Sequence, residues 1–208
     1  MHINWLGQTC VKLQTKNLKD EDVVILIDAY KPPSGDFPRS FTPQLAIFSI
    51  GDRAAKATLS QNPLVIDTLG ECESRDAMVY SLAGPENSAD LIFKIIAEGM
   101  TIVHLGRINR KLTSDTIGQI GSPDILFLPV GGAPYLDPEV AAQIVTTLEP
   151  RIVIPLGHHC DTDPKAGPVS DFIKNMGLKP EATEKKIIVK KKDLPQEETK
   201  LIILEKSY

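Results

Sequence analysis

The segment HHCDTD, at residues 158 to 163, holds the densest group of metal-ligating side chains in this 208-residue chain. His158, His159, Cys160, Asp161 and Asp163 offer imidazole, thiolate and carboxylate donors close together in sequence. Such donors could hold a zinc ion that activates water for hydrolysis. A tetrahedral site draws its ligands from separate segments, because neighbouring residues cannot all aim at one ion. The segment alone is therefore a weak indication of a metal site.

Two other segments follow apolar runs, where active-site loops are often built. His104 lies in TIVHLG, and a buried histidine after a strand is more often a hydrogen-bonded structural residue than a ligand. PVGGAP, at 129 to 134, lacks the G-x-G-x-x-G and G-K-[ST] patterns, which favours a tight strand-to-helix connection over a phosphate loop. The chain has no G-x-S-x-G elbow, so serine-nucleophile chemistry is not indicated.

Composition excludes several classes of protein. A formal net charge of −4 and the lack of a basic stripe argue against nucleic-acid binding. The Lys-rich stretch at 185 to 192 interleaves Ile187, Ile188 and Val189, which is typical of a strand with solvated lysines. No apolar run approaches the roughly 20 residues of a membrane span, and no signal sequence opens the chain, so we expect a cytoplasmic protein without membrane contact. The three cysteines form no C-x-x-C pair, so no disulfide framework is expected.

Short strand-like runs dominate residues 3 to 106, and a hairpin is predicted where Gly99 separates DLIFKII from TIVHLG. Helices then alternate with strands. One helix is predicted over 114–120 with Thr113 or Ser114 as its cap, a second after Asp137, and a third over 169–176 that stops at Gly177. We therefore predict a single α/β domain over 1–208, a four-layer αββα sandwich of two mixed β-sheets with helices outside, ending in a β-hairpin at about 185–205.

Several segments, taken in order, resemble the metallo-β-lactamase fold superfamily, and within it the branch of L-ascorbate-6-phosphate lactonase. They are INWLGQTC at 3 to 10, ILIDAY at 25 to 30, TLGEC at 68 to 72, TIVHLG at 101 to 106, ILFLPVGG at 125 to 132, LDPEVAAQ at 136 to 143, and EPRIVIPL at 149 to 156. The resemblance implies a site at one edge of the two sheets, where His and Asp side chains hold one or two metal ions, usually zinc, that generate a hydroxide.

The main metal motif of that family, H-x-H-x-D-H, is degenerate in this chain. If Ser49 matches the residue before the motif, its His, His, Asp and His positions are taken by Ile50, Asp52, Ala54 and Ala55. Three of these four side chains cannot bind a metal.

The other implied ligand positions also differ. Arg107 stands where the family has the metal-bridging Asp of H-L-G-D, and Gln8 replaces the His of L-G-H-S-C. The loop AGPENS after residue 82 lacks the expected His. Only PLGHHC keeps imidazoles, with His158 or His159 as the equivalent residue. Because zinc catalysis needs about three protein ligands, we expect no metal cofactor.

The leading hypothesis is a pseudoenzyme that acts through binding or assembly. Arg53 and Arg107 enter the former metal region, where Arg107 either pairs with Asp52 or helps to bind a small anionic ligand; the ion pair is favoured. The alternative is a hydrolase with zinc or another divalent metal at a relocated mononuclear site, built from His158, His159, Asp161 or Asp163 and joined by His104. A third hypothesis is a scaffold that forms a homo-oligomer through its sheet edges or its predicted C-terminal hairpin.

Overall fold

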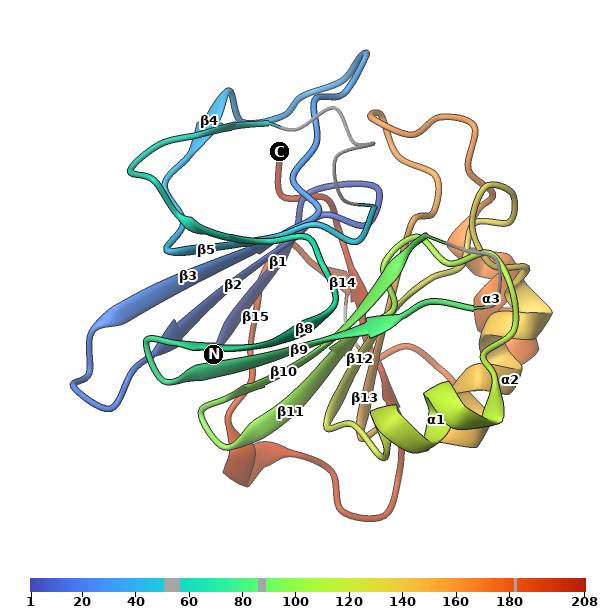
Figure 1. Ribbon diagram of the computed structural model, residues 1–208. Coiled ribbons are helices and arrows are strands. Elements are labelled where there is room, and N and C mark those ends of the chain that lie inside the picture. Colours follow the sequence, from blue (N-terminus) through green and yellow to red (C-terminus); the bar gives the residue numbers. More distant parts are fainter. Residues whose placement is uncertain (51–56, 86–88, 182) are drawn as a thin grey trace.

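A computed structural model describes residues 1–50, 57–85, 89–181 and 183–208 (Figure 1). Its first sheet is mixed, with β1, β2 and β3 antiparallel and β3, β5 and β7 parallel. The strand order across this sheet is β15 (Ile187–Ile188), β1 (His2–Trp5), β2 (Val11–Lys16), β3 (Asp22–Ile27), β5 (Leu45–Ile47) and β7 (Leu64–Ile66). Because β3 and β5 are parallel, the residues that follow these two strands lie at the same edge of the sheet.

The second sheet is also mixed. Its order is β16 (Lys200–Leu201), β13 (Ile152–Leu156), β12 (Ile125–Pro129), β11 (Met100–His104), β10 (Leu91–Ala97), β9 (Ala77–Ala83) and β8 (Gly70–Ser74). The hairpin predicted at Gly99 is confirmed, because β10 and β11 pair antiparallel up to Ala97 and Met100. Two small sheets join β4 (Ser40–Phe41) to β6 (Thr58–Leu59) and β14 (Thr183–Glu184) to β17 (Ile203–Leu204).

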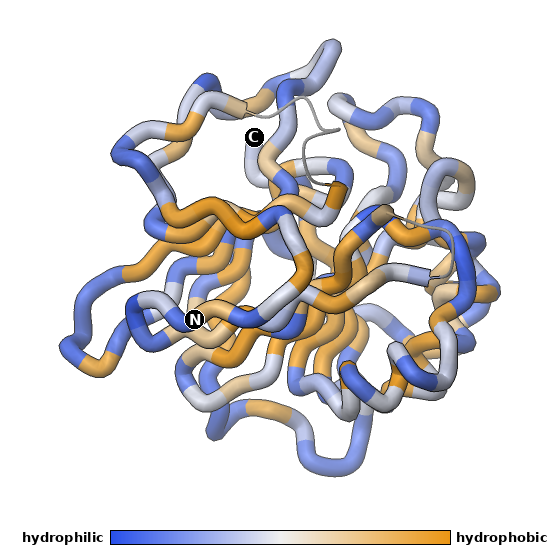
Figure 2. Tube along the Cα trace, in the orientation of Figure 1, coloured by the Kyte–Doolittle hydropathy of each residue, from blue (hydrophilic) through white to orange (hydrophobic). Residues whose placement is uncertain are grey.

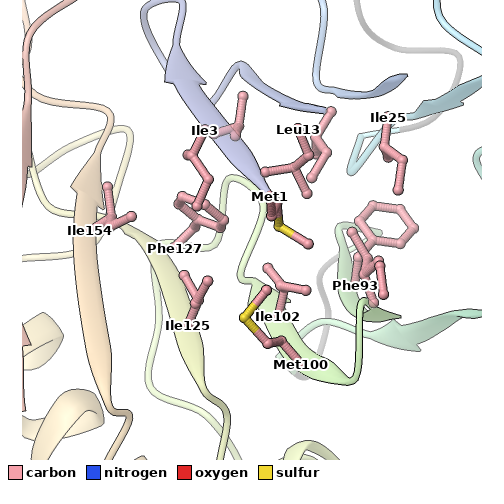
Figure 3. Close-up of a cluster of buried hydrophobic side chains, with 14 of the residues drawn as sticks. Met1, Ile3, Leu13, Ile25, Phe93, Met100, Ile102, Ile125, Phe127 and Ile154 are labelled. Atoms are coloured by element: carbon pink, nitrogen blue, oxygen red, sulfur yellow. The ribbon is translucent and has the colours of Figure 1, made fainter. Parts of the chain in front are cut away.

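The main core lies between the two large sheets. Figure 3 shows Ile3, Leu13 and Ile25 of the first sheet facing Phe93 and Phe127 of the second. All five side chains are fully buried. In Figure 2 the strands are the most hydrophobic part of the trace, and most connecting loops are hydrophilic. Burial of apolar surface between the sheets, at about 25 cal/mol per Å², is the main stabilising contribution.

The helices predicted from capping signals are confirmed. α1 (Ser114–Ile120) is capped by Thr113, α2 (Pro138–Leu148) by Asp137, and α3 (Val169–Met176) ends at Gly177 in the left-handed conformation. These described helices all pack on the outer face of the second sheet, on one side of the molecule (Figure 1). None of the helices in the described ranges has the length and apolar character of a membrane span.

The outer face of the first sheet is covered by irregular chain over the described ranges. Leu26, Ala46 and Phe48 pack there against Phe37 and Phe41 from the segment that leads into and includes β4. The two mixed sheets of the predicted metallo-β-lactamase fold are confirmed, and the described helices occupy one of the two outer layers.

The predicted C-terminal hairpin at about 185–205 is wrong. β15 pairs with β1, whereas β16 pairs with β13 in the other large sheet. The segment between them contains a 3-10 helix, η2 (Lys191–Asp193), rather than a tight turn. Each apolar segment completes the edge of a different sheet, where buried Ile187 and Leu201 join two separate clusters. A hairpin would have left one of the two sheet edges uncovered.

Candidate functional site

Strands of both large sheets end at one place, where a buried polar ring joins them. The ring consists of Thr9, Asp28, Ser49, His104 and Gly106. Thr9 Oγ1 donates to Asp28 Oδ2 at 2.8 Å, while Ser49 donates to the same carboxylate from its amide at 2.6 Å and its hydroxyl at 2.8 Å. Asp28 is 8% exposed and Ser49 is fully buried. The carboxylate is therefore held by three short hydrogen bonds from protein donors.

His104 closes the ring from the second sheet. Its Nδ1 accepts from the Gly106 amide at 3.0 Å, and its Nε2 lies 2.9 Å from the Thr9 carbonyl oxygen. Because Nδ1 accepts, Nε2 carries the proton and donates to Thr9. Burial lowers the pKa of His104, whereas Asp28 and the Thr9 carbonyl act in the opposite direction. The His104 imidazole is therefore neutral at pH 7. Both imidazole nitrogens are thus engaged with the backbone.

A second set of contacts, the arginine chain, consists of Gln8, Arg107, Tyr135 and Asp163. Arg107 Nη1 donates to Gln8 Oε1 at 3.2 Å, and the guanidinium carbon lies 5.4 Å from the centroid of the Tyr135 ring. Tyr135 donates from its hydroxyl to Asp163 Oδ2 at 2.6 Å. Burial raises the pKa of Tyr135, which keeps its hydroxyl protonated as a donor. Arg107 is held by an amide oxygen and an aromatic face.

His158 lies next to the arginine chain. Its ring centroid is 4.2 Å from that of Trp5, and the Trp5 indole donates to the carbonyl oxygen of Gln8 at 2.8 Å. His158 is only 6% exposed, and its buried Nε2 has no hydrogen-bond partner among the described residues. Burial lowers the pKa of His158 to about 4. The residue is a neutral imidazole with one unengaged nitrogen.

The lowered pKa of His158 predicts a loss of stability in acid. The unfolded chain binds a proton near the ordinary pKa of 6.5, whereas the folded protein resists it until about pH 4. The free energy of unfolding should therefore fall as the pH drops from 6.5 towards 4, by up to about 3 kcal/mol from this residue.

Urea unfolding measured across this pH range tests the prediction. His158→Leu should flatten the acid limb, and His159→Gln serves as the matched control because His159 is exposed. An unchanged acid limb in His158→Leu would show that other groups cause the instability, with His104 as the next candidate.

The remaining residues of HHCDTD point to different partners. Asp161 Oδ1 forms an ion pair with Lys206 at 2.9 Å, and Oδ2 accepts from the Asp36 amide at 2.9 Å. Cys160 Sγ lies 3.3 Å from Thr162 Oγ1. Asp163 belongs to the arginine chain. The structure therefore does not bring His158, His159, Asp161 and Asp163 to one point.

The candidate residues of the first loop are described only in part. Ile50 is half-buried at the end of a described segment, and Asp52, Arg53, Ala54 and Ala55 lie outside the described residues. The predicted pairing of Arg107 with Asp52 therefore stays a prediction.

Sequence reasoning missed four residues of this region: Thr9, Asp28, Ser49 and Tyr135. Asp28 had a readable signal, because an acidic residue directly after the apolar run VVILI is expensive to bury unless hydrogen bonds hold it. Tyr135 had no such signal, since its contact with Arg107 depends on the packing of two distant loops.

The two mixed sheets, with polar residues gathered where their strands end, define a metallo-β-lactamase fold. The chain belongs to the beta-lactamase superfamily domain family, whose model matches residues 2–157. This finding confirms the resemblance to the metallo-β-lactamase superfamily, and the resemblance to the lactonase branch stays a prediction.

Relatives with curated names are called UPF0173 metal-dependent hydrolases. One from Aeropyrum pernix is 22% identical over 73% of this chain and 72% of its own length. One from Caldivirga maquilingensis is 26% identical over 59% of this chain and 52% of its own length, and one from Sulfurisphaera tokodaii is 35% identical over 48% and 44%. The chain thus spans about half the length of these last two relatives.

Solved structures share the fold at low sequence identity. A metallo-β-lactamase superfamily protein from Thermotoga maritima has a TM-score of 0.78 at 24% identity and covers 98% of both chains. A metallo hydrolase from Ignicoccus hospitalis has a TM-score of 0.62 at 16% identity, covering 85% of this chain and 90% of its own.

The donor set of the described residues does not fit a metal centre. No group of three His, Cys, Asp or Glu side chains placed to hold a metal occurs within the described ranges. Asp28 and His104 are engaged by protein hydrogen bonds, and Asp163 accepts from Tyr135. Among the candidate ligands in the described ranges, His158 keeps a buried nitrogen without a hydrogen-bond partner, and a zinc site needs about three ligands.

Proposed function

We propose that this chain is a noncatalytic member of its family, in which protein side chains take the place of the metal and the function is binding or assembly. The observation that carries the proposal is the arginine chain. Arg107, a permanent cation, stands at the position of the Asp in the family's H-L-G-D pattern and is held by Gln8 and Tyr135. A metal ion placed beside this guanidinium would meet electrostatic repulsion.

The buried polar ring supports the same proposal. Its carboxylate and imidazole are the kinds of groups that metal ligation uses, yet each is engaged by backbone and hydroxyl partners. This arrangement needs no metal to satisfy its buried groups, and buried polar groups are costly only when they lack partners.

Metal analysis of the protein tests this proposal. Protein purified without chelator should contain substoichiometric zinc, manganese and iron, and its unfolding midpoint should not change when EDTA is added. A stoichiometric metal whose removal lowers the midpoint would overturn the proposal, because a metal bound only to the native state stabilises it.

The arginine chain should contribute measurably to stability. Arg107→Met removes the hydrogen bond to Gln8 and the cation–π contact with Tyr135, so the free energy of unfolding should fall by about 1–2 kcal/mol. Urea unfolding measures this loss. Arg110→Met is the matched control, because Arg110 is exposed and should change stability by less than about 0.5 kcal/mol. Equal effects of the two variants would contradict a structural role for Arg107.

The names of the curated relatives favour a second candidate, a metal-dependent hydrolase. These names support it more directly than they support a noncatalytic role. The unengaged Nε2 of His158 is the feature of this chain that fits it best, at a relocated mononuclear site. If metal analysis gives a stoichiometric ion, this candidate predicts that His158→Leu abolishes metal binding. The metal content of His159→Gln, in the same loop, then shows whether the neighbouring imidazole also contributes to binding.

A further inference from the structure

A cavity of about 360 Å³ lies beside the segment that covers the first sheet. Its lining includes Lys31 and Arg39, the ring of Phe37, and Tyr30. None of its lining residues belongs to the buried polar ring or the arginine chain. The volume is within the range of about 300–1,000 Å³ found for small-molecule sites.

The two cations of this cavity have no acidic partner among the residues that the structure describes. Lys31 and Arg39 are exposed, and neither forms an ion pair or a hydrogen bond with the described residues. The acidic residues nearest to them in sequence, Asp28 for Lys31 and Asp36 for Arg39, are not among the lining residues. An ammonium and a guanidinium on one concave surface favour an anion, and guanidinium suits the geometry of phosphate.

The aromatic wall of the cavity adds a second requirement. Phe37 packs between Tyr30 and Phe41, with ring centroids at 4.5 Å and 5.6 Å. Phe37 is half-buried, so part of its ring lines the cavity. A flat ring on the ligand could pack against it, and such aromatic contacts contribute about 0.5–1.5 kcal/mol beyond burial.

The segment that forms the cavity is anchored, so the cavity is formed before any ligand binds. Asp161 accepts from the Asp36 amide and pairs with Lys206, which also donates to the Asp36 carbonyl oxygen. Tyr30 donates to Thr162 at 2.6 Å from the first end of the segment. Preformed sites bind more tightly because less ordering accompanies binding.

We propose that this cavity binds a small organic phosphate that carries an aromatic ring, with the phosphate on Lys31 and Arg39 and the ring on Phe37. The inference names a ligand class for the proposed binding role and rests on that role. Metal content tests the role and ligand titration tests the ligand class, so each can fail without the other.

Calorimetric titration with AMP and with phenyl phosphate tests the proposal, with adenosine and inorganic phosphate as partial ligands. At least one of the two ring-bearing phosphates should bind, and both partial ligands should bind at least about tenfold more weakly. Lys31→Ala and Arg39→Ala should each weaken binding about tenfold. Lys19→Ala, which alters an exposed lysine in the distant β2–β3 turn, should leave it unchanged.

The two cation variants alter exposed side chains, and thermal unfolding should show that both remain folded. Failure of both AMP and phenyl phosphate to bind at millimolar concentration would overturn the proposal. Binding that is insensitive to both Lys31→Ala and Arg39→Ala would also overturn it, because the ligand would then lie elsewhere.

Discussion

Replacing Gly131 with alanine should lower the free energy of unfolding by about 3 kcal/mol, which corresponds to a fall of about 10 °C in the unfolding midpoint. Gly131 follows β12 and faces the loop that carries His158. A Cβ atom at this position would overlap with the carbonyl oxygen of Gly157 and would lie 3.0 Å from the Ala166 Cβ. The obstacle is backbone, so no side chain can simply rotate away.

The same substitution should disturb the site. The Gly131 carbonyl oxygen accepts from the Gly167 amide at 2.7 Å, and Gly167 accepts from the His159 amide at 2.9 Å. Pushing this loop outward would therefore move His158 away from Trp5. Trp5 is the single tryptophan of the chain, so this movement should change the intensity or the emission wavelength of its fluorescence. The spectra are measured below the unfolding transition.

Gly118→Ala is the matched control for Gly131→Ala. Gly118 is exposed in α1, and a Cβ there would have no heavy atom within 4 Å. Because alanine favours a helix interior over glycine, this variant should be stabilised by about 0.5–1 kcal/mol. If the two variants have the same stability, the prediction that a Cβ atom cannot be accommodated at Gly131 is wrong.

Much of the fold was predictable because local signals decided it. Thr113, Asp137 and Gly177 mark helix ends through side-chain or backbone chemistry within a few residues. The C-terminal strands were not predictable in the same way. Ile187 and Leu201 lie in similar apolar runs, and only the edges left open by two distant sheets decide where each strand pairs.

The location of the candidate site could be predicted from the sequence, but the contacts between its side chains could not. The order of segments located Gln8, Arg107 and His158 near one another, and Trp5, Gln8 and Gly157 do link these loops. The partners of each side chain depend on rotamers and on loop packing that no spacing encodes. Tyr135 under Arg107 and Asp161 on Lys206 are both contacts between segments far apart in sequence.

Asp28→Ala should have the second large effect, a loss of about 4 kcal/mol in the free energy of unfolding. The variant removes the acceptor of three short hydrogen bonds and leaves the donors of Thr9 and Ser49 buried without it. Asp28 also has a φ of 51°, which costs alanine about 1 kcal/mol more than it costs aspartate. Urea unfolding at pH 7 measures the total.

Asp28→Asn separates the hydrogen bonds from the backbone conformation. Asparagine tolerates the left-handed region and keeps one acceptor oxygen, so the loss should be about 2 kcal/mol. Asp76→Ala is an exposed control, since its carboxylate accepts from the Leu18 amide at 2.9 Å and it too has a positive φ. That variant should lose about 1–2 kcal/mol, because it has the same backbone cost but loses only one exposed hydrogen bond.

The Asp28 variants also discriminate between the two candidate functions. If the ring is held only by protein donors, the loss in Asp28→Asn should be the same with and without EDTA. If Asp28 instead supports a metal centre, chelator should destabilise the parent protein, because a metal stabilises a protein by binding to its native state. The stabilities of the parent and of Asp28→Asn should then become more similar in EDTA. A loss that disappears in EDTA would therefore favour the metal-dependent hydrolase, and a constant loss favours a site that side chains alone stabilise.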